Sequence, residues 1–173
     1  MKKTKSRSDK YVFFDLETTG FSPYNGDRVV EIGAVAWHGK KFIGEFDSLV
    51  QIDKRIPERA TQIHGITNHM LIGKPRPEEI FPAFFGFIED SILVSHNVEF
   101  DLRFLRYEFE QIGLTLNHKF QCTVDLSRRK LRRLNDYKLE TVVKHLFPDA
   151  CNQSHRALDD AKMVARIWIE LVR

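Results

Sequence analysis

The heptapeptide YVFFDLE, residues 11–17, decides how this chain of 173 residues folds. It follows a polar segment and is mostly apolar, which predicts a buried β-strand. Asp15 and Glu17 stand two positions apart, so both side chains leave the same face, with their Cα atoms roughly 6.6 Å apart. A surface strand is the alternative, but the apolar neighbours disfavour it. Because unpaired carboxylates are costly to bury, a metal ion is their expected partner.

The rest of the sequence predicts an α/β protein. Strands over 28–37 and 41–50, joined by a turn at 38–40, form an antiparallel meander of three with the first strand. Residues 91–95 predict a central strand. The other expected elements are a short strand at 120–124 and helices at 57–64, 78–89, 98–112, 126–133, 139–147 and 156–172. Antiparallel strands followed by alternating strands and helices indicate a mixed β-sheet flanked by helices.

Length and composition predict one domain over 11–173, preceded by a basic, flexible tail over 1–10. No apolar run approaches the ~20 residues that span a bilayer, and the N-terminus lacks the apolar stretch of a secretory signal. A cytoplasmic location without membrane contact is therefore expected. Cys122 and Cys151 form neither a CxxC pair nor a disulfide framework, so we expect packing thiols rather than a zinc or redox site.

Basic residues gather in two places, although the net charge is only +3. One is the tail, and the other is the run RRKLRR at 128–133. For either cluster alone, a solvated tail or helix face is as good an explanation as an anion-binding surface. Beside an acidic site that repels phosphates, the second cluster gains weight as a contact for a nucleic-acid strand.

Two more carboxylates and a histidine stand at predicted element boundaries. Asp101 lies just inside the helix that follows the 91–95 strand, where short loops hold catalytic side chains at a sheet edge. The alternative is an acidic residue favoured by the helix dipole. Asp160 lies in the first turns of the last helix, and His155 precedes it by five residues. A lone histidine there is more often a surface or capping residue than a base.

Together these residues resemble the three motifs of the DnaQ-like (DEDDh) 3′–5′ exonucleases of the ribonuclease H-like superfamily. The matches are Asp15-x-Glu17, His96-Asn97-x-x-Phe100-Asp101 and His155-x-x-x-x-Asp160. The resemblance runs from about Tyr11 to the C-terminus. The stretches DLETTG at 15–20 and HGIT at 64–67 look particularly like the proofreading epsilon and PolC-type exonuclease domains of bacterial DNA polymerase III. The resemblance implies a ribonuclease H-like sheet.

The resemblance also implies a two-metal hydrolysis with Mg²⁺ or Mn²⁺. Asp15, Glu17 and Asp160 match the residues that hold the ion on the nucleophile side, and Asp101 with Asp15 lies close to the second ion. One ion lowers the pKa of a bound water and the other stabilises the leaving 3′ oxygen. His155 matches the general base, a role that suits an imidazole with a pKa near ~6.5.

Substrate contacts are implied at three positions. Thr18 looks like the residue that borders the 3′-terminal nucleotide in relatives, and His64 resembles a nucleotide-contacting histidine, with a structural role as an equal alternative. Phe100 either stacks on a base or packs in the core. His96 and Asn97 are expected to shape the strand-to-helix turn rather than to touch metal.

The leading functional hypothesis is a 3′–5′ exonuclease of the proofreading or repair type. It acts on single-stranded DNA 3′ ends, releases nucleoside 5′-monophosphates and has a DNA polymerase subunit as a candidate partner. The first alternative is an exoribonuclease or oligoribonuclease-like RNA-trimming enzyme, because RNA recognition depends on contacts to the 2′-hydroxyl. The second is a non-catalytic, polymerase-associated binding subunit, which the intact motifs disfavour. A third alternative is a purely structural fold with acidic strands at its surface. Such a protein is expected to have no affinity for metal ions.

Overall fold

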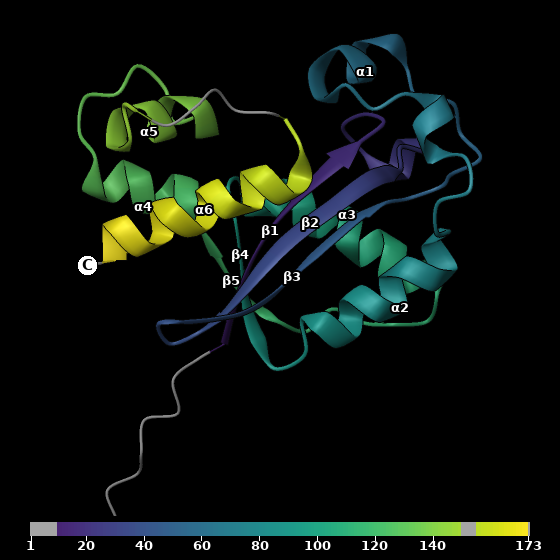
Figure 1. Cartoon of the computed structure of the whole chain (residues 1–173), viewed down its shortest axis with the longest axis horizontal. Helices are drawn as coiled ribbons and strands as arrows, with labels where there is room; N and C mark the ends of the chain where they lie inside the picture. The colour runs from purple at the N-terminus through teal and green to yellow at the C-terminus, as the bar shows by residue number, and fades with distance from the viewer. Residues whose placement is uncertain (1–9, 150–154, 173) are drawn as a thin grey trace, which may run out of the picture.

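The computed structural model describes residues 10–149 and 155–172, which form one mixed sheet between helices (Figure 1). The sheet has five strands in the order β3-β2-β1-β4-β5. Its strands are β1 (Lys10–Thr18), β2 (Val29–His38), β3 (Lys41–Leu49), β4 (Ser91–Ser95) and β5 (Lys119–Cys122). The first three strands form an antiparallel meander, while β4 runs parallel to β1, and β5 parallel to β4. The predicted α/β architecture, a mixed sheet flanked by helices, is confirmed.

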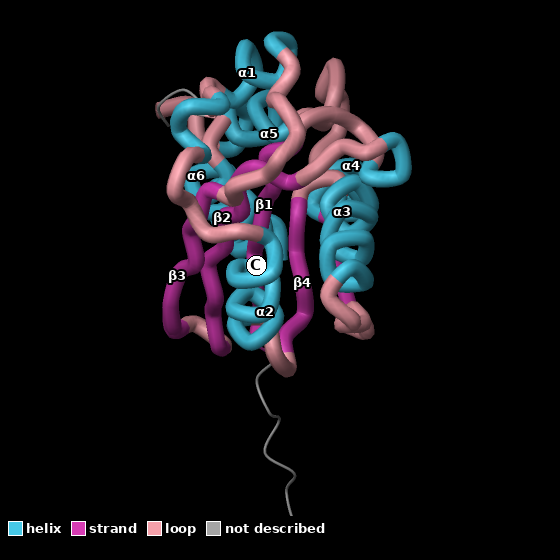
Figure 2. The backbone as a smooth tube through the Cα atoms, turned by 90° about the vertical axis from the view of Figure 1, so that its right-hand side faces the viewer, coloured by secondary structure: helices cyan, strands magenta, loops and turns pink. Residues whose placement is uncertain are grey.

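Helices cover both faces of this sheet (Figure 2). They are α1 (Glu58–His64), α2 (Pro77–Phe87), α3 (Val98–Gln111), α4 (Thr123–Lys130), α5 (Leu139–Leu146) and α6 (Ala157–Val172), with 3₁₀ turns η1 (Pro23–Asn25) and η2 (Asn68–Leu71). The 3₁₀ turns were not predicted, because single turns carry no periodicity. Among the described residues, no helix is long and apolar enough to cross a membrane.

The central strand β1 separates two hydrophobic cores. Val12 and Phe14 point into the core that α2 and α3 cover. Phe13 points into the opposite core, which the sheet shares with α4, α5 and α6. Because side chains alternate along a strand, Asp15 and Glu17 leave β1 on the same face as Phe13. Both acidic residues are therefore directed toward α6, near the carboxyl end of β1.

The start of β1 differs from the prediction. Lys10, expected in the tail, begins the strand, and its Nζ donates hydrogen bonds to the carbonyl oxygens of Phe87 (2.7 Å) and Glu89 (3.0 Å). The remaining tail residues, 1–9, lie outside the described residues. The same is true of Cys151, whereas Cys122 is half-buried against the first core, as a packing thiol would be.

The other differences lie around β5 and α4. The strand ends at Cys122 rather than at residue 124, and the helix spans Thr123–Lys130 rather than 126–133. Thr123 is buried, and its hydroxyl donates to the carbonyl oxygen of Ser95 at 3.2 Å. This contact with the end of β4 turns the chain into a helix earlier than its own periodicity indicates.

Close packing between α6 and β2 depends on Gly33. A Cβ atom at this position would stand 2.1 Å from the backbone nitrogen of Leu158 and 2.2 Å from the carbonyl carbon of Ala157. Gly33 is paired with Asp15 across the antiparallel ladder, and opposite residues of such a pair share a face. The missing side chain therefore lets the first turn of α6 approach the acidic positions of β1.

We expect Gly33→Ala to destabilise the fold by about 3 kcal/mol, because the overlap is with backbone atoms that cannot rotate away. Chemical denaturation measures this change. The matched control is Gly86→Ala in α2, where a Cβ meets no atom within 4 Å; it is expected to stabilise the protein by about 0.5–1 kcal/mol. Equal stability of the two variants would contradict the close approach of α6.

Candidate metal centre

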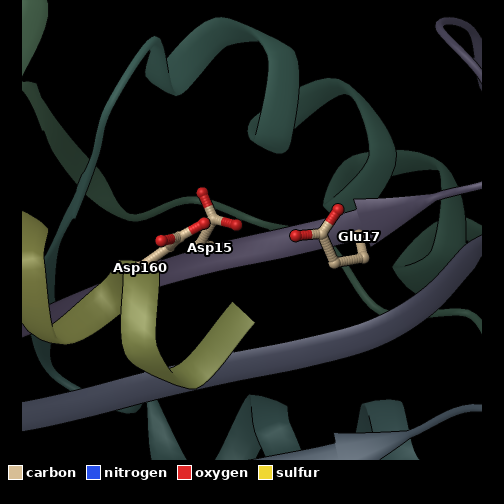
Figure 3. A group of neighbouring side chains, drawn as sticks. All are labelled: Asp15, Glu17 and Asp160. Carbon is tan, nitrogen blue, oxygen red and sulfur yellow. The ribbon is translucent and has the colours of Figure 1, made fainter. Parts of the chain in front are cut away.

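Three carboxylates from the two ends of the chain meet beside β1. One oxygen each of Asp15, Glu17 and Asp160 lies within 4.8 Å of the others (Figure 3). Asp15 and Glu17 are half-buried at the carboxyl end of β1, and Asp160, in the first turns of α6, is only 4% exposed. The structure therefore brings together three of the four predicted acidic ligands.

The fourth predicted acidic ligand, Asp101, comes from helix α3. It lies in the first turns of α3 and is 3% exposed, and its Oδ2 accepts a hydrogen bond from the hydroxyl of Ser95 at 2.6 Å. Asn97 enters α3 with a left-handed backbone (φ 72°), which turns the chain sharply after β4. Asp101 is outside the group of three, but its charge acts on Asp15.

The environment of these acids favours their protonated forms. Burial, followed by the charges of Asp101 and Glu17, raises the pKa of Asp15 well above its usual value. Burial and the charge of Asp160 raise the pKa of Glu17 to about 9. Burial raises the pKa of Asp101 to about 7, although the hydrogen bond from Ser95 lowers it. Without a compensating cation, this cluster therefore resists full ionisation at neutral pH.

A divalent cation fits this donor set. All four side chains offer carboxylate oxygens, which are the ligands preferred by hard ions such as Mg²⁺ and Mn²⁺. A bound cation reverses the repulsion among the carboxylates and lowers their pKa values. The acidic cluster thus has the chemistry of a metal centre.

Metal and pH are expected to act together on stability. The metal-free native state binds more protons than the unfolded chain, because the pKa values of Glu17 and Asp101 are raised from 4.5 and 3.8. Their contribution to the free energy of unfolding therefore falls as the pH rises through about 7 and about 9. Thermal melts in EDTA should show this fall, and Mn²⁺ should raise Tm more at about pH 8.5 than at about pH 5.5.

The difference between wild type and Glu17→Gln isolates the contribution of Glu17 from those of the other groups that titrate. In the variant, both the alkaline loss in EDTA and the gain with Mn²⁺ should shrink. A Tm that does not respond to Mn²⁺ at either pH would contradict a metal centre.

His155 lies in the segment that leads into α6. It is exposed, and its backbone adopts a left-handed conformation (φ 47°), uncommon for a non-glycine residue. Arg156 follows it directly, and Asp160 lies one turn into the helix. The entering position predicted for this histidine is thus confirmed, whereas its role as a base stays a prediction.

Glu31 on β2 anchors this entrance, a function that the sequence analysis missed. Its carboxylate is 1% exposed and accepts hydrogen bonds from the Arg156 guanidinium, including Nε at 2.9 Å, and from the backbone nitrogen of Ala157 at 3.0 Å. Glu31 therefore fixes the residue next to His155 and caps the start of α6. The available signal was one acidic residue within an otherwise apolar strand.

We expect Glu31→Gln to cost about 1.5–3 kcal/mol in the free energy of unfolding, because a charged acceptor of several hydrogen bonds is removed. The guanidinium remains partly solvated, which limits the penalty. The matched control is Glu45→Gln, which removes an exposed ion pair with Lys162 and should cost less than about 1 kcal/mol. Urea titrations compare the two; equal losses of stability would contradict an anchoring role.

The implied substrate contacts occupy different surroundings. Thr18 ends β1, and its hydroxyl donates to the carbonyl oxygen of Gly20 at 2.6 Å. His64 ends α1, which lies beyond the carboxyl end of β1 (Figure 1), and burial lowers its pKa. Its Nδ1 accepts a hydrogen bond from the backbone nitrogen of Ile66, and a hydrogen bond with the backbone of Thr18 opposes the lowering of its pKa.

Phe100 and His96 show structural contacts. The Phe100 ring is half-buried against the first core, 5.3 Å from the ring of Phe104, which matches the packing alternative. The ring of His96 contacts the hydroxyl of Thr123 (2.9 Å) and the carbonyl oxygen of Tyr137 (2.7 Å). His96 thus joins the end of β4 to two later segments, as expected for a residue that shapes this turn.

Comparison with known proteins identifies the family. The exonuclease family model RNase_T matches residues 12–168. The chain is 40% identical to the DNA polymerase III PolC-type of Clostridium perfringens, over 94% of this chain and 11% of that protein. It is 36% identical to the DNA polymerase III subunit epsilon of Aquifex aeolicus, over 94% of this chain and 80% of that protein. The chain spans about a tenth of the length of its PolC-type relatives.

A solved structure supports the same assignment. Exonuclease X in complex with 5′-overhanging duplex DNA superimposes with a TM-score of 0.72 at 27% identity, covering 94% of this chain and 90% of that one. The chain therefore belongs to the exonuclease family, as a DnaQ-like (DEDDh) 3′–5′ exonuclease domain with a ribonuclease H-like fold.

Proposed function

We propose that this protein removes nucleotides one at a time from single-stranded DNA 3′ ends, by metal-dependent hydrolysis that releases nucleoside 5′-monophosphates. The observation that carries the proposal is the cluster of Asp15, Glu17 and Asp160, with oxygens within 4.8 Å of one another and a fourth carboxylate, Asp101, close enough to act on Asp15. Two Mg²⁺ or Mn²⁺ ions are the cofactors that suit four convergent carboxylates in a phosphodiesterase.

Each residue of the cluster has its own task in this mechanism. Asp15, Glu17 and Asp160 would hold the ion on the nucleophile side, and Asp101 with Asp15 would hold the second. When bound, the ions lower the pKa of the attacking water and neutralise charge on the leaving 3′ oxygen. The Ser95 hydroxyl orients Asp101 for this task through its 2.6 Å hydrogen bond.

His155 serves as the general base in this proposal. Its place just before α6 lets the imidazole accept the water proton and release it to solvent, and a histidine changes its charge near neutral pH. Glu31 supports it indirectly, by holding Arg156 and Ala157 against β2. Thr18 and His64 would border the 3′-terminal nucleotide, because both lie near the carboxyl end of β1.

The relatives support DNA as the substrate. The two curated relatives described above are DNA polymerase III proteins, and Exonuclease X was solved with DNA. A proofreading or repair role beside a DNA polymerase is the corresponding context, with the polymerase as partner. An exoribonuclease is the alternative outcome of the test below, because the sugar is distinguished by contacts to the 2′-hydroxyl.

The test incubates the protein with 5′-labelled single-stranded DNA and RNA of the same sequence, in Mg²⁺, Mn²⁺ or EDTA. We expect a one-nucleotide ladder that shortens the DNA from its 3′ end with either metal and not in EDTA. Asp15→Asn controls for contaminating nucleases and should abolish cleavage. Faster cleavage of RNA than of DNA would replace the substrate assignment, and intact substrates with both metals would overturn the exonuclease proposal.

The same assay tests the general base. His155→Ala should lower kcat by about 10²–10⁴-fold with a much smaller change in KM, because the proton acceptor is removed while the groups that bind the substrate remain. A change mainly in KM would instead assign His155 to substrate positioning.

A further inference from the structure

A hollow of about 710 Å³ lies beside the metal centre and is not part of it. Its walls come from the start of α3, the end of β5, the helix α4 and the loop before α5. Arg128 and Arg129 line it from α4, Phe120 from β5, and Tyr137 and Lys138 from the loop. Cationic and aromatic side chains therefore face a common space.

The hollow and the metal centre share one edge of the sheet. Strands β1, β4 and β5 are parallel, so their carboxyl ends lie on the same side, near the start of α3 and α4 (Figure 2). Val98 lines the hollow, and Asp101 follows it by three residues on α3, about 4.5 Å along the helix axis. A bound strand that leaves the metal centre along this edge of the sheet therefore meets the hollow.

The cations here are not neutralised within the protein. Arg128 and Arg129 belong to the run at 128–133, whose arginines and lysine are exposed, and none of these side chains forms an ion pair with another described residue. Favourable interaction with the helix dipole explains cations in the last turn of α4. It does not explain Arg132 and Arg133, which follow the helix, or Lys138, which lines the hollow from the loop before α5.

The acidic side chains of the hollow are mostly engaged elsewhere. Glu99 is paired with Arg106 at 3.7 Å. The carboxylate of Asp136 accepts a hydrogen bond from the backbone nitrogen of Lys138 at 3.1 Å, and a hydrogen bond from Thr141, followed by this one, lowers its pKa. Asp125 is the remaining acid of the lining. The cations thus outnumber the acids available to balance them.

The walls of the hollow are held in place by contacts within the protein. His96 binds Thr123 and the carbonyl oxygen of Tyr137, and the Tyr137 hydroxyl donates to the carbonyl oxygen of Leu131 at 2.9 Å. The guanidinium of Arg128 lies over the Tyr137 ring, 5.8 Å from its centre. Phe120 is 41% exposed, and the guanidinium of Arg106 lies over its ring, 6.0 Å from the centre.

We propose that this hollow binds the strand being degraded, a few nucleotides 5′ of the scissile phosphate. Arg129 and Lys138 contact its phosphates and Phe120 supports a base. Exposed cations that track a backbone, combined with an aromatic platform, bind single strands without sequence preference. This inference rests on the proposed function, because it requires a nucleic acid whose 3′ end lies at the metal centre.

The test measures binding separately from catalysis. Fluorescence anisotropy in EDTA follows 5′-labelled oligothymidylates of two and about 20 nucleotides. Arg129→Gln combined with Lys138→Gln should weaken binding of the long oligonucleotide about tenfold, with an effect that grows with length. The slope of log Kd against log salt should also fall by about 0.7 for each phosphate that the variant no longer binds.

The matched control is Lys40→Gln combined with Lys41→Gln, which removes the same charge from the exposed β2–β3 turn at the opposite edge of the sheet. This pair should bind both oligonucleotides as the wild type does. Equally weakened binding in the two double variants would overturn the proposal and show a non-specific effect of net charge. Phe120→Ala, which removes the platform but no charge, should weaken binding of the long oligonucleotide without changing the salt slope.

Two further outcomes separate this proposal from the exonuclease assignment. If the double variant at Arg129 and Lys138 binds the long strand as the wild type does and cleaves normally, the proposed role of the hollow is overturned. The exonuclease proposal then stands. If the wild type binds the long strand through the hollow but cleaves nothing, the exonuclease proposal fails, and the hollow remains a binding site for a single strand that is not degraded.

Discussion

The metal centre depends on the close approach of α6 to the β1–β2 ladder. Asp160 reaches the acids of β1 because the first turn of α6 rests on Gly33, the ladder partner of Asp15. Two positions along the ladder, Glu31 faces Glu17 and is neutralised by Arg156. Without that guanidinium, two carboxylates directly opposite each other would repel. Helix α6, which carries Asp160, is thus held against the ladder by steric fit at Gly33 and by the ion pair between Glu31 and Arg156.

The antiparallel and parallel parts of the sheet make different contributions to this site. The antiparallel meander supplies the ladder on which α6 rests, and the parallel strands bring several carboxyl ends to one edge. Asp101 approaches from that edge, held by Ser95 at the end of β4. Burial raises the pKa values of these acids, so the folded chain resists their full ionisation unless a divalent cation offsets the repulsion. Because the fold prevents the carboxylates from separating, it would favour the binding of a divalent cation.

The motifs predicted the acidic residues well, because each stands at an element boundary that local sequence marks. Asp15 and Glu17 follow an apolar run, and Asp101 follows a strand-to-helix switch. The boundaries of β5 and α4 were predicted less well, since the buried Thr123 makes its decisive contact with Ser95, far away in the sequence. The anchoring function of Glu31 was not predicted for a similar reason, because its partner, Arg156, lies 125 residues later in the sequence.

The sequence by itself determined the α/β class, the combination of antiparallel and parallel strands, and the identity of the acidic residues, because hydrophobic periodicity and spaced motifs are local properties. Only the tertiary structure decided that Asp15, Glu17 and Asp160 lie within one ion's reach, and that Glu31 anchors the segment beside His155. It also brought Arg129 and Lys138 into the lining of one hollow. These relations depend on how distant segments pack, and packing is fixed by steric fit and burial across the whole sheet.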